Sequence, residues 1–140
     1  MVGMRTISDF KPFVPSNEYE VSKAFYECLG FTISWDSGDV CEVDTGFGFR
    51  FLLLPKNHNN YAHSLMLHFD VGSAQEWYDY FLSVGLTEKF AGTKVAAPKL
   101  MPWGLLITYV WDPAGVLLHF AEDPKSRQSE VRNETHHISA

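Results

Sequence analysis

The stretch FYECLGF at residues 25–31 and the stretch YFLSVGL at residues 80–86 share one pattern. In both, apolar and aromatic side chains recur at helical spacing, and a glycine follows them, Gly30 in the first and Gly85 in the second. Glycine ends helices readily because it adopts a left-handed backbone conformation without steric penalty. The pattern predicts two helices that end in the same way in two related units.

Strand-like segments surround the first of these helices. Asn17, followed three residues later by Glu20, is a possible capping box at its start. Turn-forming residues at 36–39 and 44–46 separate the segments that come after it. The expected strands of the first unit are residues 10–14, 31–35, 40–43 and 47–54.

The same order of elements begins again at Leu65. Apolar and polar residues alternate over residues 65–71, which predicts a half-buried strand. Ser73 and Glu76 form a capping box for the second helix. A loop rich in small residues is expected at 91–102. Two final strands are expected at 105–111 and 116–121, joined by a turn with Pro and Gly.

The repeated order predicts one α+β domain over residues 1–124 of the 140-residue chain. Module one spans about 8–56 and module two about 63–122. Residues 125–140 are polar and lack apolar periodicity, so we expect a loosely ordered tail there.

Composition excludes several classes of protein. The net charge is −6 and no basic stripe is present, which argues against a nucleic-acid partner. No apolar run is long enough to cross a membrane. The two cysteines lack zinc-binding spacing, so we expect a reducing, cytoplasmic setting. Aromatic residues make up 15% of the chain, which fits either a bulky core or an aromatic binding cleft.

Several motifs, in their order and spacing between residues 10 and 121, resemble the vicinal-oxygen-chelate superfamily of glyoxalases, bleomycin-resistance proteins and dioxygenases. The motifs are Phe13-Val14-Pro15, residues 22–31, residues 67–71, Pro102-Trp103-Gly104 and residues 111–116. The resemblance implies paired βαβββ modules that form a cupped, open-barrel mixed sheet with helices on the outer face. It also implies a homodimer.

Catalytic members of that superfamily hold a divalent metal at four positions, which the resemblance carries over to Asp9, Phe51, Met66 and His119. Phe51 cannot ligate a hard cation, and Met66 prefers soft metals. Because half of the ligand set is missing, we predict a metal-free protein without a cofactor. An alternative uses His68 in place of Met66, which gives the triad Asp9, His68 and His119.

Alternation along the expected strands places one set of side chains inside the cup, and tryptophans near its rim complete a mostly apolar pocket. By the same alternation Arg50 points outward into solvent. A different interpretation is that Phe49 and Phe51 fill a dimer or module interface. The predicted ligand-binding residues are Trp35, Phe49, Phe51, Met66, His68, Trp103 and His119.

The predicted function is metal-free binding of a small aromatic or cationic organic molecule, as in the drug-sequestering bleomycin-resistance proteins that the chain resembles. The main alternative is a metal-dependent lyase, isomerase or dioxygenase of the glyoxalase type. A metal-free enzyme with His68 or His119 as general base, or a scaffold protein, remain further options. The sequence does not identify the ligand.

Overall fold

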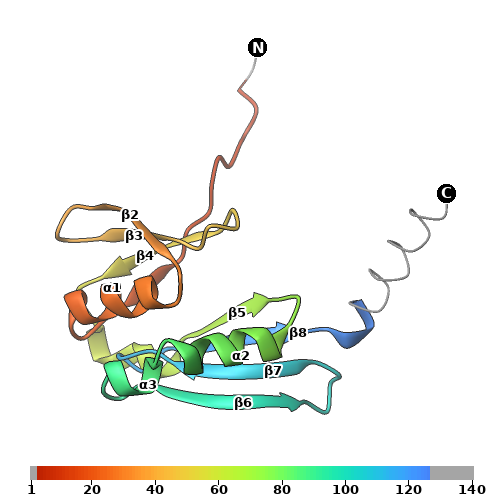
Figure 1. Cartoon of the computed structure of the whole chain (residues 1–140). Coiled ribbons are helices and arrows are strands. Elements are labelled where there is room, and N and C mark those ends of the chain that lie inside the picture. The colour runs from red at the N-terminus through yellow and green to blue at the C-terminus, as the bar shows by residue number, and fades with distance from the viewer. Residues whose placement is uncertain (1–2, 127–140) are drawn as a thin grey trace.

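The computed structural model describes residues 3–126, which form two modules of the same element order (Figure 1). Module one contains β1 (Phe13–Pro15), α1 (Tyr19–Cys28), β2 (Thr32–Asp36), β3 (Cys41–Asp44) and β4 (Arg50–Leu54). The segment η1 (His58–Ser64) leads to module two. Module two contains β5 (Met66–Asp70), α2 (Ala74–Ser83), α3 (Leu86–Lys89), β6 (Lys94–Leu100), β7 (Leu106–Trp111) and β8 (Leu117–Glu122). The predicted α+β class and the βαβββ repeat are confirmed.

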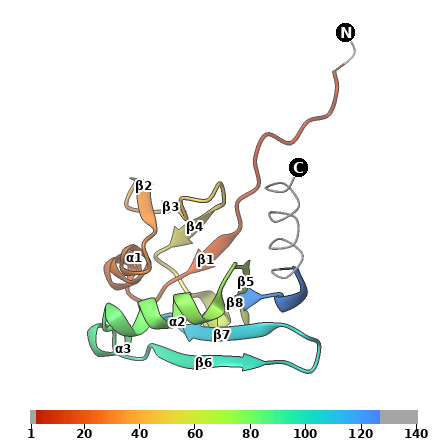
Figure 2. The same ribbon diagram turned by 45° about the vertical axis from the view of Figure 1, so that its right-hand side comes forward.

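Each module builds a four-stranded mixed sheet with the same topology. The strand order is β1-β4-β3-β2 in module one and β5-β8-β7-β6 in module two. In each sheet the first strand pairs in parallel with the last, and the remaining pairs are antiparallel. The two sheets are not closed into a barrel, and they lie apart in both views (Figures 1 and 2).

One helix covers one face of each sheet, and the opposite face of each sheet carries no helix among the described residues (Figures 1 and 2). In module one Phe25 and Tyr26 of α1, and Leu29 at the C-cap of this helix, are buried in the core. In module two Trp77 and Phe81 of α2 pack their rings on Phe120 of β8. The amphipathic pattern of the two helices thus determines which face of each sheet is buried.

The cores of the two modules join into one. The rings of Phe31 and Phe69 lie 6.0 Å apart across the junction. Tyr26 of α1 donates a hydrogen bond of 2.6 Å to Oδ2 of Asp112, in the turn between β7 and β8. Both side chains are fully buried, and burial is the main cause that raises the pKa of each. This hydrogen bond ties the helix of module one to the last hairpin of module two.

The start of module one differs from the expectation. The first strand is Phe13–Pro15 instead of residues 10–14. The capping box at Asn17 was also wrong, because α1 begins after Glu18 and no side chain caps it. The Asn17 side chain instead accepts a hydrogen bond from Asn57 at 2.8 Å. The other predicted box is partly formed, since the Ser73 hydroxyl accepts from the Glu76 N–H at 3.1 Å.

The loop expected at 91–102 was also wrong, because it contains strand β6. Alanine, lysine and proline occur infrequently in strands, so the pattern concealed it. β6 is one of the two outer strands of its sheet, and its pairing with β7 shifts register between Ala96 and Lys99. An edge strand tolerates the missing N–H of Pro98 in this irregular stretch.

Residues 127–140, most of the predicted polar tail, lie outside the described residues. Among the helices of residues 3–126, none has the length and apolar character required to span a lipid bilayer.

Candidate functional site

A cleft of about 930 Å³ separates the two modules. The loop before β4 and the segment before β1 form one wall, and β5 with neighbouring aromatic residues forms the other. The volume lies near the upper end of the range for small-molecule sites. The lining residues are Asp9, Phe10, Pro12, Phe31, Thr45, residues 47–51, residues 66–72, Trp77 and Phe120.

The turn between β3 and β4 supplies exposed aromatic rings to the first wall. Gly46 and Gly48 have φ angles of +84° and +90°, a region that favours glycine. This backbone holds Phe47 and Phe49 outside the core, with 71% and 73% of each residue exposed. Large exposed apolar side chains beside a cleft are typical of a binding surface.

Strand β5 supplies the second wall. It lies at one edge of its sheet and, within residues 3–126, β8 is the one strand with which it pairs. Met66, His68 and Asp70 are exposed, whereas Leu67 and Phe69 are partly buried against the core. All five line the cleft. An edge strand therefore offers apolar and polar groups to the same cavity.

Two histidines meet on the helix-free face of module two. His68 and His119 are register partners in the parallel pair β5–β8, and their Nδ1 atoms lie 3.3 Å apart. Nε2 of His68 lies 2.9 Å from the Asp70 carboxylate, and Tyr109 packs edge-on against His119. One Nδ1 must donate and the other accept, so the two rings cannot both hold a proton there.

Burial lowers the pKa of His119, and the nearby charge of His68 lowers it further. Nε2 of His119 is buried and has no hydrogen-bond partner within residues 3–126. We therefore expect His119 to be neutral at pH 7, so it adds a polar but uncharged group next to the cleft.

A network of charges occupies the helix-free face of module one. Arg50 donates to Asp9 at 2.7 Å, and Lys11 lies 2.5 Å from the carboxylate of Glu42. Only 5% of Glu42 is exposed. Hydrogen bonding by Lys11 and then by Ser34 lowers the pKa of Glu42. The network holds the segment before β1 against β4 and carries both signs of charge.

The structure brings together four of the seven predicted ligand-binding residues. Phe49, Phe51, Met66 and His68 all line the cleft. The other three, which do not line it, are Trp35, Trp103 and His119. Trp35 and Trp103 are exposed elsewhere, and His119 lies behind His68.

The predicted orientation of the side chains along β4 was wrong. Phe51 is 4% exposed and packs edge-on against Tyr26 of α1, so it belongs largely to the core. Arg50, which was expected in solvent, instead pairs with Asp9 beside the cleft. The difference arises because pairing in the two hairpins aligns Leu52, and not Phe51, with His119. The position that the resemblance carried over to Phe51 is therefore one residue out, and Phe51 falls on the core side of its strand.

The alternative metal triad is not assembled. No three His, Cys, Asp or Glu side chains of residues 3–126 are grouped so that they could hold a metal ion. Asp9 is engaged by Arg50 and Lys11, whereas His68 and His119 contact each other.

Sequence reasoning missed several aromatic residues of the cleft, including Phe10, Phe31, Phe47 and Trp77. A signal existed for Phe47, because it stands between two glycines in a turn, where a side chain rarely enters the core. Phe31 and Trp77 follow the pattern of core residues, so no local signal distinguished them.

No family model matches the chain. The structural neighbours of the chain include proteins of the glyoxalase/bleomycin resistance protein/dioxygenase superfamily. One such neighbour is a protein of that description from Nocardioides, with a TM-score of 0.63 and 16% identity, over 86% of each chain. At this identity the likeness concerns the fold alone.

Bleomycin resistance and bleomycin-binding proteins match the chain at higher sequence identity. A bleomycin resistance protein of Klebsiella pneumoniae is 29% identical over 114 residues, which are 80% of this chain and 90% of that protein. The bleomycin resistance determinant of transposon Tn5 matches at a TM-score of 0.69 and 26% identity, covering 84% and 99% of the two chains. A bleomycin-binding protein in complex with bleomycin matches at 0.68 and 27%, covering 83% and 98%. The chain is a homologue of the bleomycin resistance proteins, as its motifs predicted.

Proposed function

We propose that this protein binds and sequesters a small organic molecule of the bleomycin type in its inter-module cleft, without a metal or other cofactor and without turnover. One observation carries the proposal. The chain matches a bleomycin-binding protein that was solved with bleomycin, at 27% identity over 83% of its length. Its own cleft supports the proposal, because aromatic and apolar side chains dominate the lining.

The charges and rings of the cleft favour an aromatic or cationic ligand. Exposed phenyl rings such as Phe47 and Phe49 attract planar rings and cations through their faces. The net charge of −6 adds a long-range attraction for a cation. Arg50 and Asp9 at the edge can orient polar substituents of the ligand.

We also propose that the protein acts as a homodimer in the cytoplasm. Met4, Ile7 and Phe10 are highly exposed in the single chain, and association with a second copy would cover such side chains. Cys28 and Cys41 are both free, which is compatible with a reducing compartment.

The test is a titration of chelator-treated protein with bleomycin, with and without copper(II), followed by recovery of the ligand. We expect saturable binding by calorimetry and bleomycin of unchanged mass at the end. The variant Phe49→Ser should weaken binding about tenfold, since it removes an exposed ring from the cleft. Trp103→Ser is the matched control, because Trp103 is also highly exposed but lies outside the lining.

Absence of saturable binding would refute the sequestration of a bleomycin-type ligand. Conversion of the ligand that depends on added divalent metal would instead favour the glyoxalase-type alternative. If Trp103→Ser weakens binding and Phe49→Ser does not, the ligand lies outside the inter-module cleft.

A further inference from the structure

A second, smaller pocket of about 370 Å³ adjoins the cleft, and we call it the side pocket. Its lining residues are Leu29, Gly30, Phe31, Thr45, Phe47, Glu76, Trp77 and Tyr80. It shares Phe31, Thr45, Phe47 and Trp77 with the cleft, and Glu76, Tyr80, Leu29 and Gly30 belong to it alone. A volume of this size lies at the low end for ligand sites, so it suits a small group better than a drug-sized molecule.

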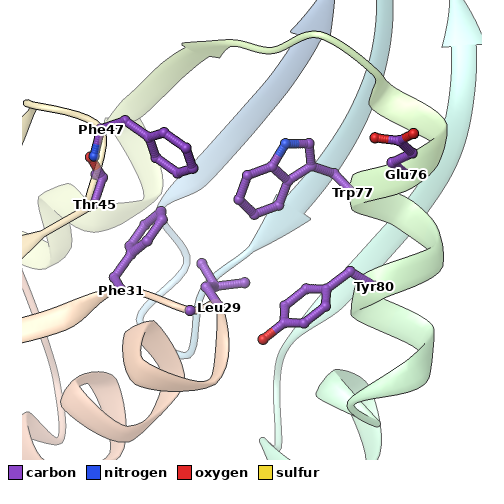
Figure 3. A pocket seen from close by; sticks show the side chains of 8 residues that line it. Leu29, Phe31, Thr45, Phe47, Glu76, Trp77 and Tyr80 are labelled. Carbon is purple, nitrogen blue, oxygen red and sulfur yellow. The ribbon is translucent and has the colours of Figure 1, made fainter.

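Aromatic rings from both modules surround the side pocket. Phe31 and Phe47 extend from module one toward Trp77 of α2, and the Tyr80 ring lies one helical turn further on (Figure 3). Tyr80 is fixed by a hydrogen bond of 2.9 Å from its hydroxyl to the carbonyl of Cys28. Trp77 is fixed by its packing on Phe120, with ring centroids 4.8 Å apart. Phe31 and Trp77 are therefore held by the core and Tyr80 by its hydrogen bond, and Phe47 is an exposed fourth ring.

Glu76 gives this aromatic pocket one negative charge. Its backbone N–H bonds to the Ser73 hydroxyl, as in a capping box. Its carboxylate, however, makes no ion pair or hydrogen bond with any residue between 3 and 126. The second half of the capping box is thus missing, and the carboxylate stands at the edge of the pocket without a cationic partner from the described chain (Figure 3).

Aromatic faces and one carboxylate are together complementary to an alkylated ammonium group. Such a cation is attracted by the negative faces of the rings, and its methyl groups bury apolar surface without requiring hydrogen bonds. A carboxylate or phosphate ligand would be repelled by Glu76. A neutral apolar ligand would leave the Glu76 charge uncompensated near its surface.

We propose that the side pocket is a recognition site for an alkylammonium cation. The site goes beyond the sequestration of a drug in the cleft, since it requires Glu76 and Tyr80, which do not line the cleft. A ligand that spans both cavities would place its planar part in the cleft and its alkylammonium group in the side pocket.

The test compares choline with 3,3-dimethylbutan-1-ol, a neutral molecule of the same shape. The chain has four tryptophans, so the indole N–H signals in a ¹H–¹⁵N NMR spectrum are few, and Trp77→Phe assigns the one of interest. We expect choline to shift the Trp77 signal in a saturable way and the neutral analogue to bind at least fivefold more weakly, because it lacks the charge.

Two matched pairs of variants locate the site. Glu76→Gln should weaken choline binding about fivefold, whereas Asp79→Asn, which removes the same charge from an exposed position of α2, should not. Phe47→Leu should weaken it in the same range, whereas Phe10→Leu alters an exposed ring of the cleft alone and should have no effect.

Equal binding of choline and the neutral analogue would overturn the proposal, as would equal effects of Glu76→Gln and Asp79→Asn. No shift of the Trp77 signal with choline would also overturn it. These outcomes are separate from the fate of the cleft proposal. If Glu76→Gln still binds bleomycin, this result supports the cleft proposal independently of the side pocket. If the protein binds choline but not bleomycin, the side-pocket proposal is supported and the cleft proposal is not.

Discussion

The last hairpin turn of each module occupies the same place in the repeat, but the two turns have different surroundings. In module one the turn between β3 and β4 extends outward and exposes Phe47 and Phe49. In module two the turn between β7 and β8 is largely buried, and its first residue, Asp112, is fully enclosed. Pairing in the two hairpins makes Thr45 the positional counterpart of Asp112. The aspartate of the module-one turn lies one residue earlier, at Asp44, and its carboxylate accepts from the Gly46 N–H.

Asp112 by contrast accepts four hydrogen bonds. Its Oδ1 receives the N–H groups of Ala114, Gly115 and Val116, each at 2.9 Å, and its Oδ2 receives the Tyr26 hydroxyl. The same element of the repeat thus forms two turns with separate tasks. The turn of module two joins the modules, which leaves the turn of module one free to carry binding residues.

The largest effect is expected from removal of the buried carboxylate. Asp112→Ala should lower the free energy of unfolding by about 3–5 kcal/mol, because it leaves several buried donors without acceptors. Asp44→Ala should cost less than about 1 kcal/mol, since its turn is solvated. Urea denaturation followed by circular dichroism measures both.

If Asp112→Ala does not fold, Tyr26→Phe provides the same comparison in milder form. It removes only the Tyr26–Asp112 hydrogen bond and should cost about 1–3 kcal/mol. Equal losses from Asp44→Ala and Asp112→Ala would contradict the division of tasks between the two turns.

Local sequence signals predicted much of the fold. The apolar spacing around Phe25 and Phe81, with glycines after it, gave both helices their correct place, because helix amphipathicity and termination are local properties. The strand at Lys94–Leu100 could not be predicted in this way. Its stability comes from pairing with β7, which is a long-range contact and overrides the weak strand propensity of its residues.

The candidate site was less accessible to prediction for the same reason. The regular alternation of β5 predicts that Met66 and His68 share the face away from the core, and both are exposed and line the cleft. Phe31 and Trp77 line the cleft only because the two modules meet there. The spacing of residues within one module does not predict contacts between modules. Trp103 was predicted as a pocket wall from its residue type and loop position. The structure places it in the turn between β6 and β7, exposed and outside the cleft lining.

The next largest effect concerns the glycines of the two turns. Gly115 has a φ of +102°, and a Cβ there would lie 2.8 Å from the ring of His63, whereas Gly46 at +84° has open space around it. Gly46→Ala should cost about 1 kcal/mol from backbone strain. Gly115→Ala should cost about 2 kcal/mol, since the His63 ring must also move.

Thermal denaturation of the two variants and of Gly115→Ala in a His63→Ala background tests this account. In that background the cost of Gly115→Ala should fall to that of Gly46→Ala. A cost that His63→Ala leaves unchanged would show that strain, and not contact with His63, distinguishes the buried turn.

A smaller effect concerns the buried carboxylate of Glu42 on the helix-free face of module one and its response to acid. Hydrogen bonding lowers the pKa of Glu42 in the folded protein, so its stabilisation is complete above its unfolded pKa of about 4.3 and is lost as pH falls through the folded value. Glu42→Gln should therefore cost about 1–2 kcal/mol at pH 7 and much less at pH 3. Glu27→Gln, at an exposed position of α1, is the control. A difference between wild type and Glu42→Gln that is the same at both pH values would contradict the role of the carboxylate charge.

The smallest effect distinguishes the starts of the two helices. Ser73→Ala removes a hydroxyl that accepts from the Glu76 N–H and should cost about 1 kcal/mol. Asn17→Ala should cost less than about 0.5 kcal/mol, because Asn17 bonds to Asn57 on the surface and caps no helix. Guanidinium denaturation of both variants resolves the difference. Equal losses would mean that Asn17 supports α1 through its bond to Asn57 as strongly as a true cap would. In that case the two modules would begin their helices by different contacts of the same strength.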